Sequence, residues 1–100
     1  MKIKKKEIPE MTIEAFANAY NLTMEIHERR LPVGNPSRYY AHFKSAEARE
    51  GTCFIIGLFG NGSTPEEAIK NYAREINLRT LIIDAMSETR REITVPRLAV

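Results

Sequence analysis

The chain has 100 residues, 43% of them hydrophobic and 28% charged, and its 15 Lys and Arg residues against 13 Asp and Glu residues give a formal charge of +2. A chain of this length can bury one hydrophobic core but has no room for a second full domain. These figures exclude large multidomain enzymes and strongly acidic mimics of DNA. We expect a basic flexible arm over residues 1–10 and a single α+β domain over residues 11–100.

The single cysteine, Cys53, has no second thiol with which to form an intramolecular disulfide. Its position in the most apolar segment of the chain predicts a buried and unreactive thiol. The apolar runs are far shorter than the roughly 20 residues of a transmembrane helix, and the first residues do not resemble a signal peptide. The sequence therefore predicts an intracellular protein with no membrane partner.

The first predicted element is a helix that Thr12 caps, with apolar residues at helical spacing up to a stop at Asn21. From Leu22 to His27 apolar and polar residues alternate, which predicts a strand with one solvated face. Proline, glycine and asparagine residues within 31–37 then predict a long loop.

Two further strands are expected after this loop. Residues 38–44 alternate again, and the polar residues 45–51 predict a turn. Residues 52–59 are apolar on both faces, which predicts a central strand. The Gly-Asn-Gly sequence at 60–62 should end that strand.

The strongest local signal begins a second helix. Thr64 can cap the amide of Glu67, the carboxylate of Glu67 can reach back to the amide of Thr64, and Pro65 suits the first helical position. We expect this helix to stop at Asn77.

Two short strands are predicted to follow, at residues 80–85 and 92–95, and Pro96 should end the second of them. The complete order is then α-β-β-β-α-β(β). We expect an α+β fold in which two helices pack on one face of an antiparallel sheet.

No catalytic, cofactor-binding or metal-binding residues are predicted, and the chain is not expected to be an enzyme. His27 and His42 occupy solvated positions of adjacent predicted strands, so their side chains can approach each other. The acids Glu25, Glu28 and Glu47 lack recognisable spacing for a third metal ligand.

Basic residues gather in the arm, around the long loop and near the C-terminus. On one shared face they would form a footprint for a polyanion, to which a tyrosine could add base stacking. The alternative is ordinary solvated charge, because acidic residues are interspersed. The candidate contacts to nucleic acid or to a partner are Lys4, Lys5, Arg29, Arg30, Arg38, Tyr40, Arg90 and Arg91.

The sequence FGNGSTPEEAIKN at residues 59–71, after three predicted strands, resembles the HicB-type antitoxin domain over residues 22–85. That resemblance implies a partial ribonuclease-H-like sheet that neutralises a small toxin by protein contact. The α-β-β-β-α order is also similar to the double-stranded-RNA-binding domain, although Pro65, Glu66 and Glu67 stand where that family has lysines. The whole chain resembles small accessory proteins of phages and prophages of Gram-positive bacteria, which implies the cytoplasm of a bacterial host.

We therefore expect a small non-enzymatic phage-type accessory protein that acts by protein–protein binding, as a regulator, an antitoxin-like protein or a host-defence inhibitor. Its partner would be a host or phage protein. The edge strand near Glu92 to Val95, or the open sheet face, would also allow a homodimer. Protein binding predicts an exposed apolar or aromatic patch that includes Tyr40. The alternative function is nucleic-acid binding through the lysine arm and the arginine clusters.

Overall fold

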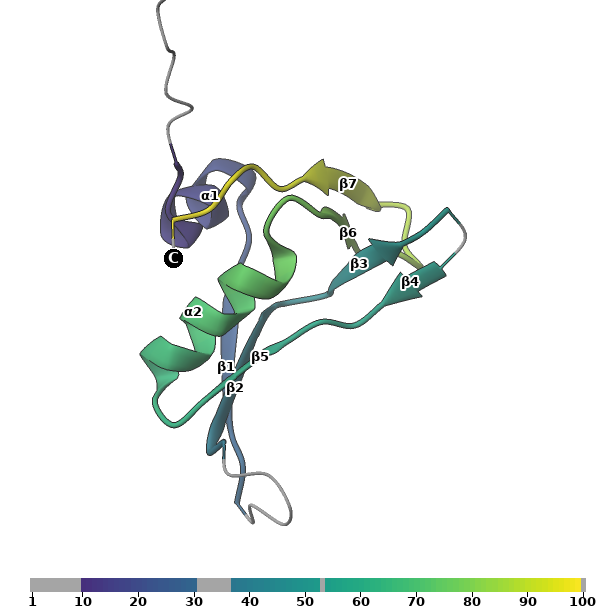
Figure 1. Cartoon of the computed structure of the whole chain (residues 1–100). Helices are drawn as coiled ribbons and strands as arrows, with labels where there is room; N and C mark the ends of the chain where they lie inside the picture. Colours follow the sequence, from purple (N-terminus) through teal and green to yellow (C-terminus); the bar gives the residue numbers. More distant parts are fainter. Residues whose placement is uncertain (1–9, 31–36, 53, 100) are drawn as a thin grey trace, which may run out of the picture.

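The computed structural model describes residues 10–30, 37–52 and 54–99 (Figure 1). Nearly all of the predicted arm, most of the long loop and Cys53 lie outside these ranges. The described residues form two helices and seven strands in antiparallel sheets, so the predicted α+β class is confirmed. In chain order the elements are α1 (Ile13–Tyr20), β1 (Met24–Glu28), β2 (Tyr39–Phe43), β3 (Ala46–Glu50), β4 (Phe54–Ile56), β5 (Gly60–Gly62), α2 (Pro65–Ile76), β6 (Thr80–Ile83) and β7 (Arg91–Thr94).

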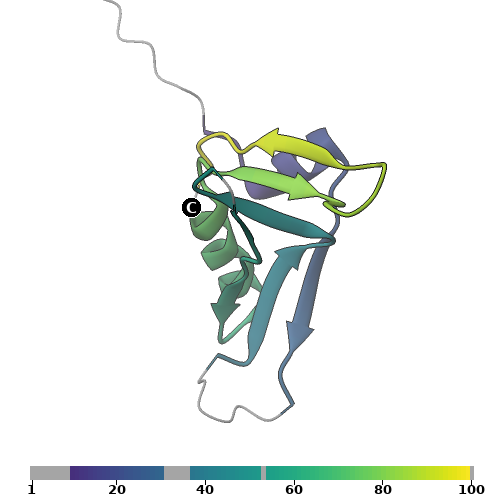
Figure 2. The same cartoon turned by 90° about the vertical axis from the view of Figure 1, so that its right-hand side faces the viewer.

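The strands divide into two sheets where the sequence predicted one. One sheet has the order β1-β2-β5 and the other the order β4-β3-β6-β7 (Figure 2). The division lies at Ser45, which has a positive φ of 57° and turns a corner between β2 and β3. Before the corner Lys44 donates its amide to the carbonyl of Thr23, and after it the carbonyl of Ser45 accepts from the amide of Asp84. The segment that pairs with β1 before the corner therefore pairs with β6 after it.

Three local predictions were wrong. Residues 45–51 do not form a simple turn, because β3 lies within them, and their strand character was hidden by small apolar residues, Ala46 and Ala48. Residues 60–62 form β5 instead of ending a strand. Residues 52–59 are not central, because β4 is the edge of its sheet and the Phe54 side chain is 69% exposed. β6 takes the inner position beside β3.

Both helices have the predicted caps. The hydroxyl of Thr12 caps α1, and Asn21 ends it in a left-handed conformation with φ of 54°. The hydroxyl of Thr64 accepts from the amide of Glu67 at 3.1 Å at the start of α2. The carboxylate of Glu67 accepts from the hydroxyl of Ser63 at 3.0 Å, where the sequence predicted the Thr64 amide as its partner.

The two helices meet on Phe43 of β2. The Phe43 ring lies 6.0 Å from the ring of Phe16 on α1 and 5.4 Å from the ring of Tyr72 on α2. All three side chains are almost completely buried. The hydrophobic core therefore fills the angle between the two helices and the inner faces of the sheets.

The last described residues pair with the segment that precedes α1. Met11 and Leu98 form a parallel bridge, in which the Met11 amide donates to the Arg97 carbonyl at 3.1 Å and the Ala99 amide donates to the Met11 carbonyl at 2.9 Å. The side chain of Asn77 accepts from the Leu98 amide at 2.7 Å. The segment after β7 is thus part of the packed structure.

Candidate functional site

A row of aromatic and charged side chains covers the face of β1 and β2 that points away from the core. The register pairs Glu25 with His42 and His27 with Tyr40. Since alternate residues of a strand share a face, these four side chains lie together, opposite to the buried Phe43. We call Glu25, His27, Tyr40 and His42 the β1–β2 cluster.

His27 occupies the middle of this cluster. Its ring stacks on the Tyr40 ring, with 4.7 Å between centroids and 17° between planes, and lies 5.0 Å from the His42 ring at 14°. The Nε2 atoms of the two histidines are 3.1 Å apart. The prediction that the histidines approach each other is confirmed.

Hydrogen bonding assigns the tautomers of the two imidazoles. The Nδ1 atom of His42 is 3.0 Å from the carbonyl oxygen of Phe43, which can only accept, so Nδ1 carries the proton. In the neutral imidazole, the Nε2 atom of His42 then carries the lone pair, which accepts from the Nε2–H of His27.

Arg29 holds Tyr40 from the end of β1. Its guanidinium lies over the Tyr40 ring at 4.7 Å from the centroid and donates to the Ser37 carbonyl at 2.9 Å and to the Asn61 side chain at 2.6 Å. These contacts combine cation–π attraction with hydrogen bonds that fix the plane of the guanidinium. Arg29 therefore positions the cluster and is already occupied by contacts within the chain.

The outer edge of β1 is a second feature of this part of the molecule (Figure 2). The amide of Arg29, just after β1, donates to the carbonyl of Arg38, just before β2. Hydrogen-bonded residues alternate along an antiparallel strand, so the backbone groups of the odd-numbered residues of β1 point toward β2. The amides and carbonyls of Met24, Ile26 and Glu28 consequently point outward. No other described segment forms a ladder with this edge.

An apolar groove lies beside this edge, between α1, β1 and α2. Its volume is about 350 Å³, and its lining includes Ile13 and Ala17 of α1, Met24 of β1 and Ile69 of α2. Ile26 is on the same face of β1 as Met24 and is 44% exposed. Met24, which lines the groove, and Ile26 are thus neighbouring apolar positions on one face of β1.

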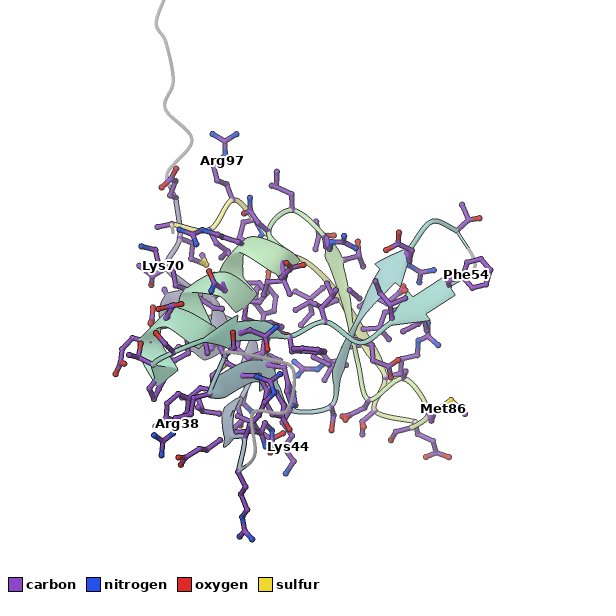
Figure 3. The ribbon with its side chains drawn as sticks, turned by 60° about the horizontal axis from the view of Figure 1, so that its bottom comes forward. Arg38, Lys44, Phe54, Lys70, Met86 and Arg97 are labelled. Carbon is purple, nitrogen blue, oxygen red and sulfur yellow. The ribbon has the colours of Figure 1, made fainter. Side chains whose placement is uncertain are left out.

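Two of the candidate arginines, Arg38 and Arg91, lie in separate places, whereas a footprint for a polyanion would need the basic residues on one shared face. Arg38 projects from the loop end of β1 and β2, where it pairs with Glu28 at 2.7 Å, and this hydrogen bond and charge raise the pKa of the Arg38 guanidinium (Figure 3). Arg91 begins β7 near the opposite end of the molecule and donates to the carbonyl of Tyr20 at 2.8 Å (Figure 1). Arg30 is exposed just after β1, and Arg90 lies 3.7 Å from Glu92. Lys4 and Lys5 lie outside the described residues.

No protein-family model, curated protein or solved structure matches this chain. The resemblances to HicB-type antitoxins, to double-stranded-RNA-binding domains and to phage accessory proteins therefore stay predictions. Within the described part of the chain, neither helix has the length and apolar character needed to cross a bilayer.

Two functional features went beyond the sequence prediction. Glu25 joins the two histidines, although its spacing from His42 along the chain has no recognisable pattern. Alternation along β1 indicated that Glu25 and His27 share a face. The register between β1 and β2, which are joined by the long loop, decides which residues of β2 lie opposite them. Tyr40 is half-buried against Arg29 and His27, whereas Phe59, whose ring lies 5.8 Å from the Tyr40 ring, is 48% exposed. Ile26 is exposed on the opposite face of β1.

Proposed function

We propose that this chain is a small non-enzymatic protein-binding module of the phage accessory type, and that the outer edge of β1 is its binding surface. The observation that supports this proposal is the combination of outward backbone groups on Met24, Ile26 and Glu28 with the adjoining apolar groove. Added strands use such edges to bind protein, since the backbone supplies affinity and side-chain pockets supply specificity.

The groove favours a partner segment with an apolar side chain. Its lining of Ile13, Ala17, Met24 and Ile69 gains free energy when an apolar group displaces water from it. The partner segment would therefore be extended, with alternate residues pointing toward α1 and α2.

The charges beside the groove favour a basic residue next to that apolar side chain. Glu14 lines the groove, and Glu66 lies in a neighbouring depression that shares Glu14, Ile13 and Ile69 with it. Lys70 offsets one of these two carboxylates, which leaves an acidic excess. A lysine or arginine of the partner would complement it.

Selection of short random peptides on the immobilised full chain tests this proposal. We expect the selected peptides to combine an apolar residue with a lysine or arginine two positions away. Hydrogen exchange should show slower exchange of the amides of Met24, Ile26 and Glu28 when such a peptide is bound.

Substitution of the exposed edge residue provides the decisive comparison. Ile26→Lys should weaken peptide binding about tenfold or more, because it removes apolar contact area from the edge. Met86→Lys is the matched control, since Met86 is fully exposed and projects from the four-stranded sheet end of the molecule (Figure 3). Equal peptide affinity for wild type and Ile26→Lys would refute the proposal.

Sedimentation over a range of protein concentrations tests whether a second copy of this chain binds the β1 edge. If a dimer forms and the same three amides become protected as it forms, a second copy of β1 is the bound segment, and the edge is again the protein-binding surface. If the protein stays monomeric and no selected peptide protects these amides, the proposal fails.

A further inference from the structure

We propose that Glu25, His27 and His42 bind a divalent transition-metal ion of the zinc class. One carboxylate oxygen and two imidazole nitrogens of these residues all lie within 4.8 Å of one another. The site does not depend on the proposed protein-binding function, because these side chains point away from the groove that Met24 lines.

The spacing of the two imidazoles fits a single ion. Two nitrogens bound at 2.0–2.1 Å in a tetrahedral site are about 3.3 Å apart. The Nε2 atoms of His27 and His42 are 3.1 Å apart, whereas the ring centroids are 5.0 Å apart, so the rings converge at these nitrogens. The two imidazole nitrogens therefore need to separate by only a few tenths of an ångström to share one ion.

The contacts of His42 prepare its Nε2 atom as a ligand. Donation from Nδ1–H to the Phe43 carbonyl keeps the lone pair on Nε2, which is the arrangement that metal-bound histidines use. In the metal-free chain the Nε2–H of His27 occupies that lone pair. When the ion binds, the proton of neutral His27 moves to Nδ1, and the ion takes the place of the shared hydrogen.

Glu25 supplies the third ligand and determines the class of metal. It pairs directly with His42 across the ladder, so its carboxylate is on the same side as both imidazoles. Two nitrogens and one oxygen suit zinc and its late first-row neighbours, whereas calcium and magnesium require oxygen ligands. Since all three residues are only half-buried, water can occupy the fourth position.

Neighbouring side chains hold the ligands in place. Tyr40 stacks on His27, and Arg29 is fixed over Tyr40 by its bonds to Ser37 and Asn61. The ligands project from two paired strands, which are more rigid supports than loops. Tyr40 and Arg29 are thus positioning residues for the proposed metal site.

A zinc titration of the untagged full chain tests the proposal by calorimetry and by NMR of the imidazole nitrogens. The chain contains only two histidines, so the imidazole spectrum reports on the site alone. We expect one zinc ion per chain and movement of both Nε2 resonances. The titration is repeated with Cys53→Ser, in which the only thiol is absent.

The variants distinguish ligands from the surrounding surface. His27→Ala and His42→Ala should each weaken zinc binding about 100-fold, and Glu25→Gln should weaken it about tenfold. Glu47→Gln is the matched control, because it removes a half-buried carboxylate on β3 outside the β1–β2 cluster. Tyr40→Leu should weaken binding about tenfold while both Nε2 resonances still move. Thermal unfolding verifies that each variant is folded.

Three results would overturn the proposal. The first is an absence of zinc binding at millimolar concentration. The second is unchanged affinity in the folded His42→Ala variant, or its loss in Cys53→Ser, because either would place the ion elsewhere. The third is equal affinity for magnesium and zinc, since a nitrogen-rich site must discriminate between them.

Discussion

Gly60 of β5 lies so close to Tyr72 of α2 that a Cβ atom on residue 60 would overlap the Tyr72 backbone nitrogen. The carbonyl of Ala68 is similarly close. Because both neighbours are helix backbone, neither can move aside cheaply. Gly60→Ala should therefore lower the free energy of unfolding by about 3 kcal/mol. Urea unfolding monitored by circular dichroism measures the loss.

Gly57→Ala is the control for that substitution. A Cβ atom at Gly57 meets nothing within 4 Å. Its effect on stability should stay within about 0.5 kcal/mol, which is usual for surface positions. Similar losses at Gly57 and Gly60 would show that close packing of β5 on α2 is not the cause.

The pKa of Tyr72 predicts a loss of stability in alkali. Burial raises the pKa of the Tyr72 phenol to about 12, and a hydrogen bond with the Phe43 backbone offsets part of that rise. The folded state thus favours the protonated phenol. The contribution of the protonated Tyr72 phenol to the free energy of unfolding is complete below the unfolded-state pKa of about 10. That contribution falls by roughly 2–3 kcal/mol as the pH rises to about 12.

Comparison of the unfolding free energies of wild type and Tyr72→Phe separates the titration of Tyr72 from the titrations of the other tyrosines and the lysines. The difference in unfolding free energy between wild type and Tyr72→Phe should change by that amount between about pH 9 and 12. Ultraviolet titration of the phenolate gives the pKa independently. Parallel stability curves for the two proteins would contradict the predicted role of burial.

Removal of the Thr64 hydroxyl should destabilise α2. The hydroxyl accepts from the amide of Glu67, which otherwise has no partner within the helix. Thr64→Ala should reduce the free energy of unfolding by about 1 kcal/mol, whereas Thr64→Ser keeps the cap and should be nearly neutral. Chemical denaturation of both variants measures these effects, and equal losses would rule out the cap as their cause.

Asn77 should stabilise the segment that follows β7. Its side chain accepts from the amide of Leu98, whose side chain is 2% exposed. Asn77→Ala leaves that amide unsatisfied and should cost about 1–3 kcal/mol, with faster hydrogen exchange at Leu98. Asn18→Ala, which changes an exposed residue of α1, is the control and should not accelerate that exchange.

The helix ends could be predicted from the sequence because caps are local. Thr12 and Thr64 accept from amides three residues away, and the amide of Asn21 bonds carbonyls of the last turn of α1. Alternation along β1 likewise assigned Glu25 and His27 to one face. Each of these features depends only on residues that are close together in the sequence.

Contacts between distant segments decided the rest. Ser45 turns the corner that creates two sheets, and the short side chains of Ala46 and Ala48 carry no strong strand signal. Only the pairing of β1 with β2 brings His42 to Glu25 and His27, because register is set by two segments together. The sequence by itself determined the helices and the faces of β1 and β2. The tertiary structure decided the metal-ligand cluster and the free edge of β1, since both depend on which strands pair and in what register.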